Sequence, residues 1–271
     1  MNIILAGPGR AGTALCLAAA SAGHRVVAVL GRRPEAVEGA AARFDAVAFG
    51  FDDDLPAVDL LMVAVRDDAI EEVADRLAPR ASNVGAAVHL SGLKPAAALA
   101  PLADAGLATG VLHPLQTLPT PEAGAEALPG SWFAVTAHDP VLRSDLEDLV
   151  ASIGGHPFAL DDEDRALYHA AAATAANDTV AVLALAANLF AAAGVPFDAA
   201  RPLVEAVVAN AFRLGPKESL TGPIARGDVG TVVAQLQAVA DRVPEEVDRF
   251  RRLGRVVAEL AGTRGIFEEI L

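Results

Sequence analysis

A glycine-rich turn near the start of the chain is the clearest chemical signal. Gly7, Gly9 and Gly12 follow the pattern Gly-x-Gly-x-x-Gly, between a run typical of a strand and a run typical of a helix. In such a turn the first glycine permits the tight bend, the second lets the backbone approach a phosphate, and the third lets helix and strand pack closely. The helix N-terminus, at Arg10 and Ala11, offers free N–H groups to an anion. The pattern therefore predicts a site for the pyrophosphate of a dinucleotide.

The end of the second expected strand indicates which dinucleotide binds. In NAD-binding units an acidic residue about 20 residues past the glycines bonds the ribose 2′-hydroxyl. Here that position holds Arg32, followed by Arg33, and carries no carboxylate. Guanidinium groups match a phosphate with paired donors, so these arginines predict recognition of the 2′-phosphate of NADP(H). A solvated arginine pair in front of the helix-starting Pro34 is the alternative interpretation.

Polar residues follow two further strands of the same region. Val65 ends the fourth expected strand, Arg66 follows it, and Ser91 follows the fifth. Ligands of open α/β sheets lie outside the carboxyl ends of the strands. We therefore expect these three residues beside the cofactor.

Two histidines are the candidates for proton transfer. His113 follows the sixth strand, and Gln116 and Thr117 come shortly after it as candidate substrate contacts. His169 and Asn177 are eight residues apart on an almost wholly apolar helix, about two turns, and are predicted to share one face. Either histidine could act as general acid toward a developing alkoxide, with Asn177 orienting the carbonyl. The alternatives are a strand-ending turn for His113, and a satisfied core or a subunit interface for the helical pair.

A rigid segment rich in glycine and proline carries one more candidate. Arg226 could bind a substrate carboxylate, within one chain or across a dimer. Asp228 is expected to cap the next helix by accepting a hydrogen bond from the Thr231 N–H.

Short apolar runs alternate with helix-length segments through the first half of the chain. The expected strands are Asn2–Ala6, Arg25–Leu30, Ala46–Phe49, Leu60–Val65, Ala86–Leu90, Thr109–Leu112, Trp132–Thr136 and Pro157–Leu160. The expected helices are Ala11–Ala22, Pro34–Phe44, Ala69–Leu77, Pro95–Ala105 and Val141–Ile153, and Pro114–Pro129 is expected to be a loop. The alternation predicts an α/β Rossmann domain with a mostly parallel sheet and helices on both faces.

No strand signal remains after Asp161, which predicts an all-α C-terminal domain. A helix from Glu163 to Ala193 is apolar nearly all round, so it is expected to be buried on most sides. Further helices are expected at Asp198–Leu214, Val229–Asp241 and Pro244–Ala261. We predict two domains, residues 1–160 for NADP binding and residues 161–271 for substrate binding and dimerisation.

Composition excludes several classes of partner. The formal net charge of −14 over 271 residues argues against nucleic acid and anionic membranes, which need a basic face. Thr179–Phe197 has nearly the length of a membrane span, but it is alanine-rich and contains Asn188, so we expect a helix of a soluble protein. With Cys16 as the only cysteine and no His-x-x-x-His spacing, neither a disulfide nor a metal site is predicted. No signal peptide is recognisable, so a cytoplasmic location is expected.

Four stretches resemble a narrow family of Rossmann-like proteins whose C-terminal part is a domain of unknown function. They are His89–Gly92, Leu112–Thr117, Tyr168–Ala172 with Asn177, and Thr221–Asp228. More widely, the chain resembles the two-domain dehydrogenases built like 6-phosphogluconate dehydrogenase, and this resemblance implies an NADP-dependent oxidoreductase. Its relatives such as ketopantoate reductase use a lysine on the first long helix after the Rossmann domain. The only lysines of this chain, Lys94 and Lys217, lie elsewhere.

Taken with the resemblance, these residues predict an NADP-dependent reductase of a small carbonyl compound, of the 2-oxo acid type used by ketopantoate and hydroxyacid enzymes. Reduction of a C=N bond, as in pyrroline-carboxylate reductases, is the alternative enzyme class, and the missing lysine favours it. A non-catalytic NADP-binding protein or sensor is the alternative outside enzymes. Because an extended apolar surface rarely stays uncovered, we also expect a homodimer formed through the C-terminal helices.

Overall fold

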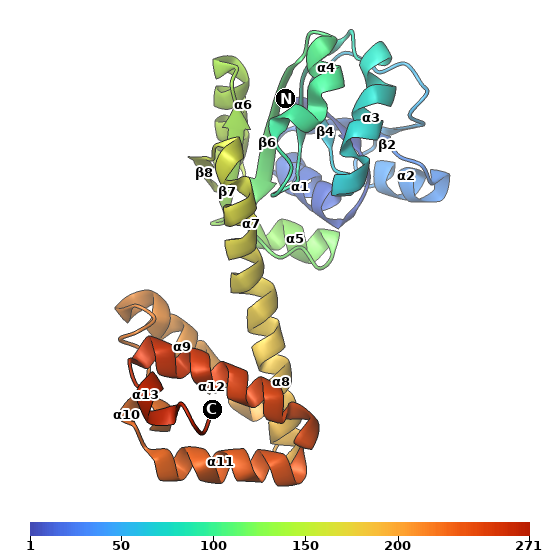
Figure 1. Cartoon of the computed structure of the whole chain (residues 1–271). Coiled ribbons are helices and arrows are strands. Elements are labelled where there is room, and N and C mark those ends of the chain that lie inside the picture. The colour runs from blue at the N-terminus through green and yellow to red at the C-terminus, as the bar shows by residue number, and fades with distance from the viewer. The chain divides into compact units, whose positions relative to one another are not determined.

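The chain forms two compact units, Met1–Ala173 and Thr174–Leu271, in the computed structural model, which describes residues 1–271 (Figure 1). The first unit is built around a sheet, and the second contains only helices. This division by element type confirms the predicted fold class.

The sheet of the first unit has eight strands in the order β3-β2-β1-β4-β5-β6-β7-β8. Only β6 and β7 pair antiparallel, so the sheet is mostly parallel, as predicted. Because β1, β2, β4, β5 and β6 all run in the same direction, their carboxyl ends meet at one edge. The strands are β1 (Asn2–Ala6), β2 (Arg25–Leu30), β3 (Val47–Phe49), β4 (Val58–Val63), β5 (Val84–His89), β6 (Ala108–Pro114), β7 (Trp132–Ala137) and β8 (His156–Ala159).

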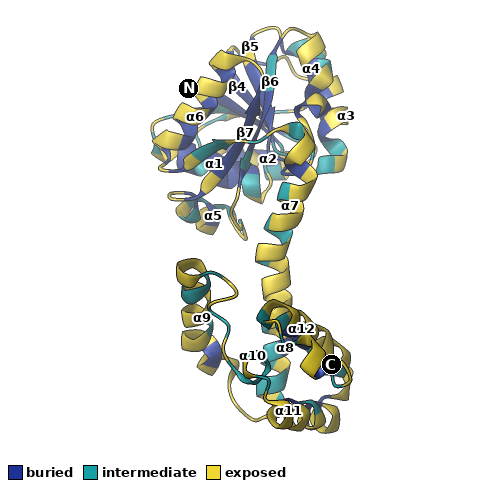
Figure 2. Cartoon of the chain, turned by 60° about the vertical axis from the view of Figure 1, so that its left-hand side comes forward, coloured by how far each residue is buried: buried dark blue, intermediate teal, exposed yellow.

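Helices cover both faces of this sheet. They are α1 (Arg10–Ser21), α2 (Pro34–Ala41), α3 (Ile70–Leu77), α4 (Ala100–Asp104), α5 (Pro121–Ala127), α6 (Pro140–Ser152) and α7 (Arg165–Ala173). Ile3 and Leu5 of β1 join a core cluster with α1, α2 and α6, whereas Ile4 and Ala6 join a second cluster with α3 and α4. Figure 2 shows the result as buried strands between partly exposed helices. Strands covered on both faces explain the nearly continuous apolar runs of the sequence.

The loop predicted at Pro114–Pro129 is wrong in its second half, where the chain forms α5. Thr120 caps this helix, because its side chain accepts a hydrogen bond from the Ala123 N–H at 3.2 Å and Pro121 stands at the first helical position. Gly124 then lets α5 pack closely on α1, since a Cβ there would lie 2.8 Å from the Ala14 Cβ. Turn-forming residues at this site therefore start a helix.

The first compact unit extends past the predicted boundary at residue 160 and includes α7. Arg165, at the start of α7, is only 1% exposed. Its guanidinium pairs with Asp162 at 2.8 Å and also donates to the Thr136 hydroxyl on β7. Asp162 in turn accepts from the Ala96 N–H. These contacts fix the first turns of α7 to the sheet.

The second unit begins with a π-helical turn, Thr174–Asp178, and continues as α8 (Thr179–Ala192), α9 (Arg201–Leu214), α10 (Pro223–Arg226), α11 (Val229–Arg242), α12 (Val247–Ala261) and α13 (Arg264–Phe267). Its small core contains Val232, Ala258, Phe267 and Leu271. Asp228 caps α11 by accepting from the Thr231 N–H at 3.1 Å, which confirms that prediction.

The predicted burial of the long apolar helix is wrong for the single chain. Of α8 only Leu185 is buried, and Val180 and Val182 are exposed. Figure 2 accordingly shows this helix largely as exposed residues. Asp162–Ala192 also passes a length and composition test for a membrane-crossing helix, with a mean hydropathy of 1.4, a test that core helices of soluble proteins pass as well.

Candidate active site

A cavity of about 740 Å³ opens at the carboxyl edge of the sheet, beside the glycine turn. It brings together six of the predicted cofactor residues, namely Gly7, Gly9, Arg32, Arg33, Val65 and Arg66. These residues follow three different strands, β1, β2 and β4, that lie side by side in the sheet. The direction of the strand order reverses between β1 and β4. Open α/β sheets bind dinucleotides at such a switch point.

The conformation and the close packing of the turn require glycine at residue 7. Gly7 has a φ of 95°, and a Cβ there would lie 2.6 Å from Val65 Cγ1 and 2.9 Å from the Ala64 carbonyl oxygen. Gly9 is the N-cap of α1, so no capping side chain competes for the free N–H groups of the first helical turn. No acidic residue stands in that turn. The turn therefore fits a pyrophosphate.

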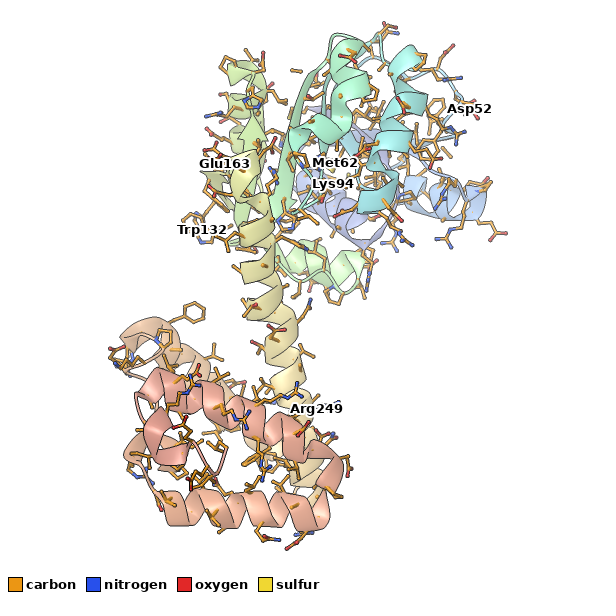
Figure 3. The ribbon with its side chains drawn as sticks, in the orientation of Figure 1. Asp52, Met62, Lys94, Trp132, Glu163 and Arg249 are labelled. Atoms are coloured by element: carbon orange, nitrogen blue, oxygen red, sulfur yellow. The ribbon has the colours of Figure 1, made fainter.

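The lining of the cavity is rich in arginine. Arg32 and Arg33 line it together with Arg66 and Arg76. Arg76 stands 5.3 Å from the centre of the Phe51 ring and pairs with Asp52 at 2.8 Å. Figure 3 labels Asp52 on the outer side of this region. Guanidinium groups offer paired donors to a phosphate. A cavity lined by four arginines therefore fits the 2′-phosphate of NADP better than the free ribose 2′-hydroxyl of NAD.

Sequence reasoning missed Arg76 and Phe51. Phe51 follows β3, and Arg76 lies on α3, so neither belongs to the glycine turn or to the strand ends that carry the fingerprint. Their proximity depends on how α3 packs against the sheet through Ile70 and Val73. The one signal that the sequence contained is that Arg76 is the only basic residue on the polar face of α3, beside Glu71, Glu72 and Asp75.

Four predicted cofactor residues do not line this cavity. Gly12 is buried against the sheet, where a Cβ would lie 2.5 Å from the Ala64 Cβ, so it serves helix–strand packing. Arg10 directs its guanidinium to the Pro119 carbonyl at 3.4 Å, and Ala11 belongs to the first turn of α1. The Ser91 hydroxyl accepts from the Lys94 N–H at 2.9 Å. A cofactor role for these four residues stays a prediction.

The second group of predicted residues assembles around Gly92, at the neighbouring ends of β5 and β6. A Cβ at Gly92 would lie 2.8 Å from His113 Nε2 and 2.9 Å from His169 Nδ1, so both ring nitrogens lie over the same side of this residue. The two rings meet at 78° with their centroids 6.4 Å apart. The structure thus brings together the two histidines that the sequence proposed separately.

Tyr168 completes this cluster, and sequence reasoning gave it no role. Its hydroxyl lies 2.8 Å from His113 Nδ1, and its ring also meets Phe158 of β8. His113, Tyr168 and His169 all belong to the first unit, because α7 is fixed to the sheet. As the only tyrosine, and next to His169 in the chain, Tyr168 was detectable as a candidate.

Burial makes His113 a neutral imidazole near pH 7. Its pKa is lowered to about 4, mainly by loss of hydration and also by the positive charges of His169 and Arg165, while Asp67 acts in the opposite direction. Burial also raises the pKa of Tyr168 to about 12, so its hydroxyl keeps its proton. His169 is exposed to solvent on α7. The cluster therefore combines a neutral buried histidine with an accessible one.

The loop after β5 is held by its own hydrogen bonds. His89 is fully buried; its Nε2 lies 3.0 Å from the Pro95 carbonyl oxygen, and its Nδ1 accepts from the Ser91 N–H at 3.2 Å. Burial lowers the pKa of His89, and its buried hydrogen bonds indicate a packing role. This network fixes the backbone at Gly92, over which the other two histidines meet. Lys94, labelled in Figure 3, bonds Glu71 at 3.3 Å.

The remaining predicted residues make other contacts or belong to the second unit. The Gln116 amide donates to Ser131 at 3.1 Å and its oxygen accepts from the Thr117 N–H at 2.8 Å, so both residues hold the loop before α5. Arg226 is exposed on α10 of the second unit. Asn177 lies in the π-helical turn, which interrupts the α-helical spacing from which a shared face with His169 was predicted. Their substrate roles stay predictions.

Comparisons with known families account for both parts of the chain. Residues 1–114 match the model of the Rossmann-like domain, and residues 131–257 match the model of a domain of unknown function, DUF2520. The chain joins a Rossmann-like domain to a DUF2520 domain. This pairing confirms the resemblance stated from the sequence, and the DUF2520 match begins within the sheet, before β7. No curated protein sequence matches the chain.

Three solved structures share the fold over nearly the whole length. A proposed NADP oxidoreductase of Bacteroides fragilis is 25% identical, with a TM-score of 0.79 over 95% of this chain and 98% of that one. A protein of Thermotoga maritima is 21% identical, with a TM-score of 0.72 over 96% and 98%. The 1-pyrroline-5-carboxylate reductase of Streptococcus pyogenes is 19% identical, with a TM-score of 0.62 over 94% and 98%.

Proposed function

We propose that this protein is an NADPH-dependent reductase of a small carbonyl compound of the 2-oxo acid class. One observation carries the proposal: within one rigid sheet edge, an arginine-rich dinucleotide cavity at β1 and β2 neighbours a histidine pair at β5 and β6. The likeness to a proposed NADP oxidoreductase supports the cofactor. A cofactor site next to acid–base groups at the strand ends is the arrangement that a reductase needs.

Different residues of the chain would bind the cofactor, transfer the proton and stabilise the developing charge in such a reaction. NADPH, when bound, supplies the hydride. Gly7 and Gly9 would admit its pyrophosphate, and Arg32 and Arg33 would hold its 2′-phosphate. His169, which is exposed, gives a proton to the oxygen of the reduced carbonyl, and His113 donates a hydrogen bond to the same oxygen as negative charge develops there.

Turnover of a defined panel tests this function. We expect the purified chain to consume NADPH, followed by its absorbance, with at least one member of a series of 2-oxo acids. His169→Ala should reduce that rate by about 100-fold or more, the usual contribution of a positioned general acid. His138→Ala is the matched control, because His138 is an exposed histidine after β7 and should leave the rate unchanged. Full turnover by His169→Ala would remove His169 from the mechanism.

A C=N substrate is the second candidate, and one observation favours it. The first unit contains one lysine, Lys94, and its ammonium group bonds Glu71 and not a residue of the histidine cluster. The structurally similar Streptococcus pyogenes protein is a pyrroline-carboxylate reductase. The same panel should therefore include cyclic imines, and activity on these alone would select imine reduction. Tight NADPH binding without turnover of any compound would instead indicate a non-catalytic NADP-binding protein.

We propose further that the protein is a cytoplasmic homodimer formed through its C-terminal helices. Exposed apolar side chains on α8 and α9 support this; they are Val180, Val182, Leu203, Val207 and Phe212. Surfaces of this kind are usually covered by a partner. Light scattering should give twice the chain mass, and Phe212→Asp, at a residue 90% exposed, should shift the protein toward monomer. A wild-type monomer at micromolar concentration would contradict the proposed dimer. Recovery of the native protein in a membrane fraction would contradict the proposed cytoplasmic location.

A further inference from the structure

The tyrosine–histidine contact at the end of β6 is more specific than general packing. The Tyr168 hydroxyl lies 2.8 Å from His113 Nδ1, and the two rings stand at 89° with centroids 5.5 Å apart. Tyr168 is held in place from the adjacent turn, because Arg165 of the same helix is buried and bonded to Thr136 and Asp162. The hydroxyl is thus aimed at one nitrogen of one histidine.

The direction of this hydrogen bond follows from the chemistry of both groups. A neutral imidazole carries one N–H, on either Nδ1 or Nε2, and accepts at the other nitrogen. The Tyr168 hydroxyl keeps its proton, and His113 Nδ1 is its only partner in the protein. If Nδ1 carried the hydrogen, the half-buried phenol hydrogen would have no protein acceptor. Donation from Tyr168 to Nδ1 satisfies both groups and leaves the hydrogen of His113 on Nε2.

We propose that Tyr168 is a positioning residue, which fixes His113 as the Nε2–H tautomer and so turns a hydrogen-bond donor toward the space over Gly92. That space is shared with His169 Nδ1. The use of the donor, on the oxygen or nitrogen of a substrate, rests on the proposed function, whereas the tautomer itself does not. A donor fixed before substrate arrives stabilises developing negative charge without reorganisation.

The charged groups around His113 are consistent with a ring that stays neutral. His169, Arg165 and His89 disfavour an imidazolium at this position, and Asp67 alone favours it. A His113 ring that is neutral near pH 7 offers an N–H as hydrogen-bond donor, not the acidic proton of an imidazolium. The two histidines therefore differ in role: His113 donates a hydrogen bond, and His169 transfers the proton.

Nitrogen NMR of the full-length chain tests the tautomer directly, with no substrate. In protein labelled with 15N at histidine, at pH 7, the resonance of His113 should show a protonated Nε2 and an unprotonated Nδ1, with His113→Gln identifying the signal. Tyr168→Phe removes only the hydroxyl and should shift His113 to a mixture of tautomers. It should also raise the pH at which His113 becomes protonated, because the neutral ring loses its donor. An Nδ1–H tautomer in the wild-type chain would overturn the proposal even if the variant failed to fold.

A matched variant separates the hydroxyl effect from any general change. Ser152→Ala removes a hydroxyl 2.9 Å from the Nε2 of a different histidine, His24, and should leave the His113 signal unchanged. With an active substrate, Tyr168→Phe should lower kcat on the order of 10- to 100-fold, as loss of an orienting partner does for other histidines, with little change in the KM for NADPH. Unchanged kcat would overturn the positioning role. A wild-type chain without turnover would contradict the proposed function alone, since the NMR result still decides the tautomer.

Discussion

The imidazole rings of His113 and His169 meet across Gly92, with their centroids 6.4 Å apart. A methyl group at residue 92 would stand less than 3 Å from a nitrogen of each ring, so both side chains would have to turn away. We expect Gly92→Ala to lower kcat by about 100-fold, the cost of misplacing a catalytic group by roughly 1 Å, while NADPH affinity stays close to that of the wild type.

Steady-state kinetics and cofactor titration check this prediction. Gly39→Ala is the control, because a Cβ there meets nothing within 4 Å and the residue lies inside α2. That variant should keep wild-type kcat. Equal losses in the two variants would mean that the histidine geometry is not the cause.

Replacing Arg32 by Asp should change the cofactor preference. Arg32 follows β2 and lines the cavity with Arg33 and Arg76. The substitution removes a charged donor from the 2′-phosphate and adds a repelling carboxylate, so NADPH affinity should fall about 10- to 100-fold and NADH affinity should change little. Fluorescence titration with both cofactors measures the ratio. Arg25→Asp makes the same charge change at the opposite end of β2 and should leave the ratio intact.

Stability should decrease as the pH falls below the ordinary pKa of histidine. The pKa of His113 is about 4 in the folded chain against 6.5 for a free side chain, so the unfolded chain binds more protons between these values. The free energy of unfolding should therefore drop by about 1 to 2 kcal/mol from pH 7 to pH 5, before most carboxylates titrate. Urea unfolding at both pH values provides the measurement. His113→Gln should lose part of this dependence, and identical slopes in both proteins would refute the assignment.

Arg165 should matter for stability far more than an exposed arginine with a similar partner. Arg165→Met would break a pair with Asp162 at a position only 1% exposed, so the first unit should lose about 2 to 4 kcal/mol. Arg201 pairs with Asp198 at the same i,i+3 spacing, but both side chains are exposed. Arg201→Met should cost less than about 1 kcal/mol. Comparable losses in thermal unfolding would show that Arg165 does not fix α7 to the sheet.

The sequence by itself determined the features that depend on local patterns. The strands β1 and β2 have the predicted bounds, and the glycine turn lies between β1 and α1 as expected. Asp228 caps its helix through a contact three residues away. Arg32 and Arg33 reach the cavity because a residue at the end of β2 must lie near the end of β1 in a parallel sheet. Such features follow from periodicity, turn chemistry and strand order, all of which are encoded within short segments.

Only the tertiary structure decided which distant side chains share a site. The meeting of His113 with His169 depends on α7 being fixed to the sheet by Arg165, a contact that no local pattern contains. Arg76 reaches the cavity through the packing of α3, and the long apolar helix leaves most of its surface exposed in the single chain although its composition predicts burial. The composition of an apolar helix predicts that its surface is buried. Which segment buries it is decided by the packing between segments, because burial is a property of the whole assembly.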